Sequence, residues 1–260
     1  MKQYIVDAFT DKPFHGNPAA VCVMDRWLSD ETMQAIAAEN NLAETAFVVR
    51  EGERYRIRWF TPSMEEELCG HATLATSFVL LTYYEPGADE VRYTSVSGDL
   101  AVRRKGDYFE LNFPTYELRE IPVTDAMEKA FGSHPIHAIL GLDLNCVFEN
   151  EDIVKKLSPD YDLLKRLPGR IWNATARGRE YDCVSRSFTP ETAVPEDPVC
   201  GSAHCQIADY WASVLGKKII RAYQASERGG ELICEPLGNG RIALRGKAVL
   251  FAVSDLTLPQ

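Results

Sequence analysis

The chain has 260 residues, of which 45% are apolar and 25% are charged, so it can build one large hydrophobic core or two smaller ones. Its 28 Lys and Arg against 38 Asp and Glu give a formal charge of −10 at pH 7. Because no run of basic residues interrupts this balance, nucleic acid is disfavoured as a partner and small solutes are favoured.

Hydropathy and cysteine usage indicate the cellular compartment. No apolar stretch reaches the roughly 18 residues of a membrane span, and the amino terminus lacks the pattern of a signal peptide. The seven cysteines include no CxxC pair, which favours reduced thiols over a disulfide framework. We therefore expect a cytoplasmic protein with no membrane partner.

Short strands and a few helices are expected along the chain. Alternating apolar positions predict a mostly antiparallel sheet, with strands at 4–9, 19–24, 44–49 and 55–60. Helical spacing predicts helices at 29–40, 71–84 and 203–215. The helix at 71–84 is apolar nearly all round, so we expect strands to enclose it. A Pro-bearing crossover after the next strand-like runs divides the chain into predicted halves, residues 1–117 and 118–260.

The two predicted halves share an internal repeat. In the first half RIRWFTP is followed by ELCGHATLA and an apolar helix, and in the second half CVSRSFTP is followed by EDPVCGSAHC and an apolar helix. A strand, an FTP corner, a loop, a Cys-Gly turn and a buried helix form too long a shared order to arise easily by chance. The sequence therefore predicts two pseudo-symmetric halves.

Each Cys-Gly turn, Cys69-Gly70 and Cys200-Gly201, stands at the amino end of a predicted helix. The first amides of such a helix have no partner within the helix, and the helix dipole favours an anion there. A small carboxylate is the expected ligand. The thiols would lie where a cysteine pKa tends to fall, so two opposed thiols are candidates for proton exchange at carbon. One such turn alone is often only a packing feature.

Glu44 is the other informative residue. If 42–49 is a strand, Leu42, Glu44, Ala46 and Val48 share one face, and a carboxyl interrupts an otherwise apolar row. A buried carboxyl suits a general acid or base that carries a proton between two carbons. The alternative is an edge strand with a wet face, on which Glu44 is merely solvated. The pattern alone leaves both interpretations open.

Two further patterns are weaker. Cys69, His71, Cys200 and His204 have the residue types of a tetrahedral zinc site, but their spacing matches no compact zinc finger. We therefore expect no metal. Gly16-Asn17-Pro18 has the composition of a turn, and a ligand contact is only its second interpretation.

The chain also resembles a known family, the PhzF family of phenazine-biosynthesis isomerases. The resemblance runs in order over essentially the whole chain, through DAFTDKPFHGNPAAV, NNLAETAFVV, RWFTP with ELCGHATLA, EDPVCGSAH and ASERGGEL. It implies the α+β fold of diaminopimelate epimerase, in which each half is a mostly antiparallel sheet around a central helix and the active site lies in the cleft between the halves. It also implies a homodimer without metal or organic cofactor, acting on a small anionic carboxylate.

The resemblance assigns roles to individual residues. Glu44 in AETAF matches the glutamate that carries the proton, and His71 of GHAT and Asp197 of EDP match residues that hold the substrate and assist the proton shift. The expected substrate contacts are Asn17 and the amides of Gly70, Ala72, Gly201 and Ser202. Two positions depart from the family pattern: Ala43 replaces the usual serine, and Cys200 stands where many relatives have threonine or another small residue.

Three functions remain in competition. The leading hypothesis is an isomerase in which Glu44 moves a proton between carbons of a small carboxylate. The second is an epimerase or racemase, because Cys69 and Cys200 match the cysteines that act as acid and base in related enzymes of that type. The third is a binding protein that kept the fold and lost the chemistry. The residues around the cysteines, GHAT and EDP, favour the first.

Overall fold

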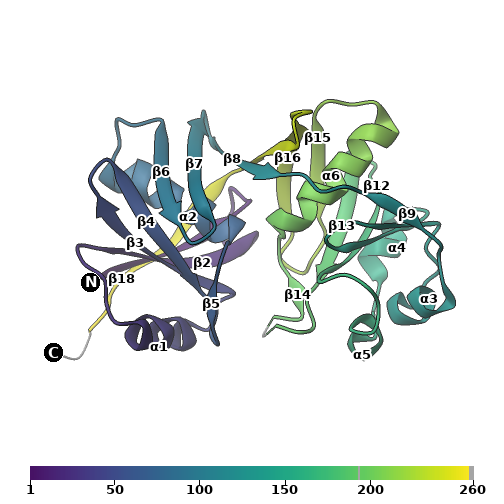
Figure 1. The fold of residues 1–260 in the computed structure, drawn as a ribbon, viewed down its shortest axis with the longest axis horizontal. Coiled ribbons are helices and arrows are strands. Elements are labelled where there is room, and N and C mark those ends of the chain that lie inside the picture. The colour runs from purple at the N-terminus through teal and green to yellow at the C-terminus, as the bar shows by residue number, and fades with distance from the viewer. Residues whose placement is uncertain (193, 258–260) are drawn as a thin grey trace. The chain divides into compact units, whose positions relative to one another are not determined.

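The computed structural model describes residues 1–192 and 194–257, which fall into two compact units. The first unit contains Met1–Asn112 and the segment that begins at Arg245; the second contains Phe113–Leu244. The last strand of the chain pairs antiparallel with the first, from Lys2 opposite Asp255 to Ala8 opposite Ala248, and Figure 1 shows it in yellow among the purple and blue strands. The C-terminal segment therefore belongs with the beginning of the chain, whereas the sequence halves placed it with the second half.

The elements of the first unit match the predicted strands and helices closely. They are β1 (Lys2–Ala8), β2 (Asn17–Met24), α1 (Asp30–Asn40), β3 (Glu44–Glu51), β4 (Arg54–Phe60), β5 (Glu65–Glu66), α2 (Gly70–Val79), η1 (Leu80–Tyr84), β6 (Glu90–Ser95), β7 (Gly98–Lys105), β8 (Tyr108–Pro114) and β18 (Ala248–Asp255). The predicted helix at 71–84 is confirmed, but its last turn, η1, is a π-helix.

The second unit follows the same order. Its elements are β9 (Arg119–Ile121), α3 (Asp125–Phe131), β10 (His137–Leu140), β11 (Leu144–Val147), α4 (Glu151–Lys156), α5 (Tyr161–Leu164), β12 (Trp172–Arg177), β13 (Cys183–Phe188), β14 (Glu196–Asp197), α6 (Gly201–Leu215), β15 (Ile220–Gln224), β16 (Gly230–Pro236) and β17 (Arg241–Gly246). No helix in the described part of the chain is long and apolar enough to cross a membrane.

The internal repeat is visible in the strand pairing of each unit. In the first unit β1 and β2 pair antiparallel, β2 and β3 parallel after α1, and β3 and β4 antiparallel. The second unit repeats this pattern: β10 pairs antiparallel with β11, β11 pairs parallel with β12, and β12 pairs antiparallel with β13. A two-residue strand and a central helix follow in both units, and then a strand parallel to β4 or β13.

The FTP corner is built the same way in both units. Arg58 donates two hydrogen bonds of 2.6 and 2.7 Å to Glu65, and Arg186 donates two of 2.7 Å to Glu196. Each guanidinium also lies over the phenylalanine ring of its own FTP segment, 5.1 and 5.0 Å from the centroid. A paired, planar contact of this kind fixes direction as well as distance. It therefore holds the loop that leads to each central helix.

Helix α2 is buried on nearly every side, as its apolar composition predicts, and it packs against β1, β2, β3 and β18. Its buried hydroxyl groups are satisfied locally. The Thr76 hydroxyl donates to the Ala72 carbonyl at 2.7 Å, and the Ser77 hydroxyl lies 2.7 Å from both the Thr73 carbonyl oxygen and the Tyr93 hydroxyl. Such bonds allow hydroxyl groups inside a buried helix without unpaired polar atoms.

Gly16 gives a test of the backbone just before β2. It has φ +67°, and a side chain there would overlap the Ala8 carbonyl oxygen. Gly52 has φ +68° with nothing within 4 Å. We expect Gly52→Ala to lower the free energy of unfolding by about 1 kcal/mol, from left-handed strain alone. Gly16→Ala should lower the free energy of unfolding by clearly more than this, because the backbone around Ala8 must also move to make room for the new methyl group. Urea denaturation measures both, and equal losses would contradict the close packing at Gly16.

Candidate active site

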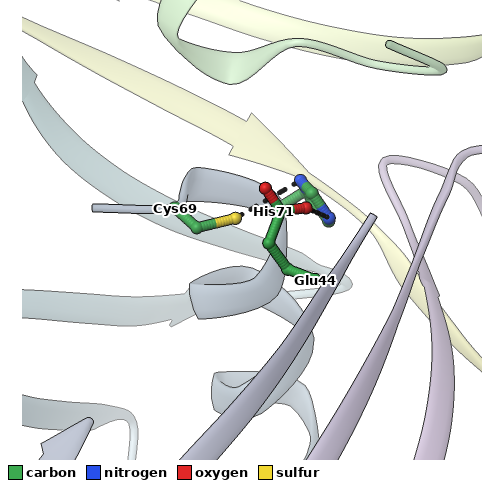
Figure 2. Close-up of side chains that lie close together, drawn as sticks. All are labelled: Glu44, Cys69 and His71. Carbon is green, nitrogen blue, oxygen red and sulfur yellow. Dashed lines mark hydrogen bonds and ion pairs between the residues drawn. The ribbon is translucent and has the colours of Figure 1, made fainter. Parts of the chain in front are cut away.

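Three side chains of the first unit point toward one another at the amino end of α2 (Figure 2). Glu44 begins β3, Cys69 is the N-cap of α2, and His71 lies in its first turn. His71 Nε2 is 3.1 Å from Glu44 Oε2, and His71 Nδ1 is 3.5 Å from Cys69 Sγ. The side chains of His71 and Glu44 are 6% and 18% exposed. Glu44 is therefore partly buried, and because β3 pairs with both β2 and β4, the alternative of an edge strand with a solvated Glu44 is wrong.

Asn17 joins this group from the start of β2. It is fully buried, and its Nδ2 lies 3.2 Å from His71 Nδ1. An amide nitrogen only donates, so this orientation of Asn17 pairs with a neutral His71 ring whose proton is on Nε2. A charged ring carries a proton on both nitrogens and pairs instead with the Asn17 amide oxygen, after the amide turns over. The contact depends on Gly16, whose left-handed backbone turns the chain into β2. The Gly-Asn-Pro segment is thus both a turn and part of the site.

The contact between Glu44 and His71 is close but poorly aligned. Neither Glu44 Oε2 nor His71 Nε2 has a hydrogen bond that meets angular criteria among the described residues, although the two atoms are 3.1 Å apart. A buried polar atom without an aligned partner retains the capacity to bind another group. Both atoms therefore keep hydrogen-bonding capacity that no described residue uses.

The electrostatics of this group centre on His71. Burial disfavours the charged ring, but Cys69 and Glu44 outweigh it and raise the pKa of His71 well above its usual value. Burial first, and the Glu44 charge second, raise the pKa of Cys69 to about 11. Because Cys69 is then a neutral thiol near pH 7, Glu44 is the partner that favours a charged His71.

A second group of predicted residues lies at the amino end of α6. Asp197 lies in β14 and is half-buried, and its Oδ1 accepts a hydrogen bond from the Val199 amide at 3.1 Å. Cys200 is the N-cap of α6, and its Sγ is 3.4 Å from the hydroxyl of the exposed Ser202. The structure therefore brings Asp197, Cys200, Gly201 and Ser202 together within the second unit, as it brings Asn17, Glu44, Cys69, Gly70, His71 and Ala72 together within the first.

Residues that sequence analysis missed hold the loop before α6. Gln224 donates to the Asp197 carbonyl at 2.5 Å and accepts from the Cys200 amide at 2.8 Å. The Ser226 hydroxyl donates to the Pro198 carbonyl at 2.6 Å. Ser226 lies in ASERGGEL, a segment that the sequence analysis singled out without assigning a function to any of its residues. In the first unit the Ser97 hydroxyl donates to the Glu67 carbonyl at 2.7 Å, which repeats the serine contact.

Burial reverses the expected effect of the helix ends on the thiols. The N-cap position favours a lowered cysteine pKa, yet burial raises the pKa of Cys69 to about 11 and that of Cys200 well above its usual value. A nearby carboxylate adds to the effect at each thiol, Glu44 at the first and Asp197 at the second. Both residues are therefore neutral thiols in this structure, and the prediction of accessible thiolates is wrong.

His204 bears on the zinc interpretation. Its Nδ1 donates to the Cys200 carbonyl at 2.7 Å, and its Nε2 lies 3.1 Å from the Ser185 hydroxyl. Burial lowers the pKa of His204 to about 4, so the ring is neutral. Because both ring nitrogens already have hydrogen-bond partners, this histidine fits the role of a structural residue better than that of a zinc ligand.

Comparison with known proteins gives a consistent picture. A family model described as Phenazine biosynthesis-like protein (PhzC-PhzF) matches residues 6–253. An uncharacterized isomerase of Pseudomonas aeruginosa is 48% identical over 254 residues, which cover 97% of each chain. A crystal structure of a PhzF-family phenazine biosynthesis protein from Enterococcus faecalis has a TM-score of 0.96 at 47% identity over 99% of each chain.

More distant structures confirm the predicted fold class. A hydroxyproline epimerase from Agrobacterium vitis has a TM-score of 0.63 at 9% identity, covering 98% of this chain and 90% of its own. At this identity the likeness concerns the fold alone. The α+β fold shared with epimerases and racemases is thus confirmed, and so is the resemblance stated from the sequence.

The thiols provide a direct test of the site's electrostatics. Because Cys69 and Cys200 are buried and protonated, we expect iodoacetamide to label neither at neutral pH in the folded protein, and to label both after unfolding in urea. Peptide mapping by mass spectrometry would measure this. Rapid labelling of either cysteine in the folded state would show that the helix end, not burial, controls the thiol pKa.

Proposed function

The chain belongs to the phenazine-biosynthesis-like PhzF family of isomerases, and on that premise we propose that it moves a proton between two carbons of a small carboxylate substrate without metal or organic cofactor. The observation that carries the proposal is the close, poorly aligned pair of Glu44 and His71. A carboxylate that is buried but not fully hydrogen-bonded can take a proton from a ligand.

The proposed reaction uses one carboxyl twice. Glu44 removes a proton from one substrate carbon, and the electron pair of the broken C–H bond moves into the adjoining π system. Glu44 then returns the same proton to another carbon, so that one C–H bond breaks, one forms and a double bond shifts. No oxidant or reductant is required. His71, 3.1 Å away, steadies the Glu44 carboxylate while it is charged and donates to charge that develops on the substrate.

The substrate carboxylate requires separate contacts. Within the first unit we propose the opening amides of α2 as contacts for an anionic group, and within the second unit those of α6, because the N-cap cysteine of each helix makes no side-chain capping bond and helix amino ends favour anions. Within the second unit Asp197, held by Gln224 through its backbone, is the proposed further substrate contact. Asn17 is fully buried, so its proposed role is to orient His71 and not to touch the substrate.

The two-thiol epimerase is the second candidate. It is supported by the equivalent positions of Cys69 and Cys200 at the two helix amino ends. Against it, both thiols have a raised pKa, whereas this chemistry needs one thiolate at neutral pH. A binding protein without activity is the third candidate, and the retained Glu44, His71 and Asp197 argue against it.

We also propose a homodimer in the reducing cytoplasm. All seven cysteines are buried and none forms a disulfide within the described residues, which suits a reducing compartment. Two exposed aromatic side chains of the first unit, Phe14 (69%) and Phe251 (51%), contact each other with ring centroids 5.5 Å apart. Exposed apolar clusters often mark protein contacts, and sedimentation velocity would measure the oligomeric state.

Glu44→Gln tests the proton carrier. NMR would follow deuterium incorporation in D2O with dihydrohydroxyanthranilate, diaminopimelate, proline derivatives and common amino acids. For any acid that the wild type exchanges, we expect Glu44→Gln to be at least about 100-fold slower, because a general base contributes about 10²–10⁴-fold. Glu53→Gln, at an exposed position, is the matched control. Wild-type exchange by Glu44→Gln would rule out Glu44 as the carrier.

The cysteines distinguish the two enzymatic candidates. Under the Glu44 mechanism we expect Cys69→Ser and Cys200→Ser each to retain exchange within about tenfold of wild type, a change of about 1.4 kcal/mol in the barrier. Chiral chromatography would look for an inverted product alongside. If either serine variant abolished exchange and the wild type gave an inverted product, the protein would be a two-thiol epimerase instead.

A further inference from the structure

A row of polar side chains crosses the sheet of the second unit on the face that packs against α6. Asn145, Asn173 and Ser187 stand directly opposite one another in the register of β11, β12 and β13, and such residues share one face. Each is at most 3% exposed. Ser185, two residues before Ser187 and therefore on the same face, contacts His204 of α6 at 3.1 Å.

The row is tied to α6 by a chain of hydrogen bonds. Asn173 Nδ2 donates to Asn145 Oδ1 at 3.1 Å, and Asn145 Nδ2 donates to the Asp143 carbonyl at 3.2 Å. Gln206 of α6 donates to Asp143 Oδ2 at 2.6 Å and accepts from the Asp143 amide at 3.1 Å. These polar groups are therefore held in place from both the sheet and the helix.

Three atoms of this arrangement nevertheless lack a partner. Asp143 Oδ1, Asn173 Oδ1 and Ser187 Oγ are buried and have no hydrogen bond within the described part of the chain. Each unpaired buried polar group costs about 1–3 kcal/mol. Three such costs in one cluster are unusual in a folded protein, where ordered water normally satisfies such groups.

The first unit has a mainly apolar row here, in which Trp59 Nε1 is the one polar side-chain atom and is also buried without a hydrogen bond among the described residues. At the equivalent positions Val21, Ala46 and Trp59 stand opposite one another, and all three are at most 1% exposed. Trp59 and Ser187 each precede the phenylalanine of an FTP corner. A hydroxymethyl group in place of an indole removes far more volume than the roughly 30 Å³ share of one water. The polar row is thus a departure from the repeat, with a smaller side chain at its end.

We propose that this row of the second unit is a binding site for ordered water. Opposite side chains on neighbouring strands have Cβ atoms about 4.5–5.5 Å apart, a span that one water can bridge by donating to Asn173 Oδ1 and pairing with Ser187 Oγ. Water fits because the unpaired atoms are two acceptors and a hydroxyl. The row ends beside Asp197, which stands opposite Ser187 in β14, so the water lies behind the residue assigned to the substrate.

Two serine variants test the proposal in the full-length protein. Ser185→Ala removes a hydroxyl with a known partner, His204, and Ser187→Ala removes one that pairs only with the proposed water. If water is bound, removing either hydroxyl leaves a buried polar group unsatisfied, so both variants should unfold at lower urea concentration with an unchanged m-value. If the site is dry, Ser187→Ala removes an unpaired group. A midpoint equal to or above the wild-type value would then overturn the proposal.

A crystal structure that resolves ordered solvent gives the second measurement. We expect density for water within hydrogen-bond distance of both Asn173 Oδ1 and Ser187 Oγ, and its loss or displacement in Ser187→Ala. A dry cluster, or side chains paired directly with one another, would overturn the proposal. Both tests are independent of Glu44 and of catalysis, so they stand whether or not the proposed isomerase reaction is correct.

Discussion

At each FTP corner an arginine donates two hydrogen bonds to a glutamate, and the rest of the site depends on this contact. Arg58 with Glu65, and Arg186 with Glu196, join the end of a long strand to the two-residue strand that follows it. The chain between that short strand and the central helix is brief, so fixing the corner fixes where the helix begins. The Cys-Gly turn can then present its amides and neighbouring side chains in the same way in both units.

The two units share this backbone arrangement but carry different side chains at equivalent positions. In the first, the position after the Cys-Gly turn is His71, which contacts Glu44 and Asn17. In the second, it is Ser202, whose exposed hydroxyl lies 3.4 Å from the Cys200 thiol. The repeat therefore supplies two similar helix ends that differ in their side chains. The first unit holds Glu44, the carboxyl proposed to move a proton, and the second holds Asp197 on a loop that Gln224 braces.

The sequence predicted most of the elements because their signals are local. Alternation predicted the strands at 4–9 and 44–49, which the structure has at Lys2–Ala8 and Glu44–Glu51. It put Glu44 on the same face as Ala46 and Val48 but left open whether that face is buried. It could not show the contact between Asn17 and His71, because that contact depends on how β2 packs against α2. Gln224 was invisible for the same reason, since its two bonds reach a loop 24–27 residues away along the chain.

The thiols show why position in a helix is a poor guide to reactivity in this fold. A helix amino end lowers a cysteine pKa through its dipole, an effect of a fraction of a charge that is confined to the first turn. Burial acts against the full charge of a thiolate and is set by everything that encloses the turn. At Cys69 and Cys200 the effect of burial is the larger one and raises the thiol pKa, and a carboxylate near each thiol raises it further. Two protonated thiols make a poor acid–base pair, and this is why the proposed mechanism assigns the proton transfer to Glu44 and not to the cysteines.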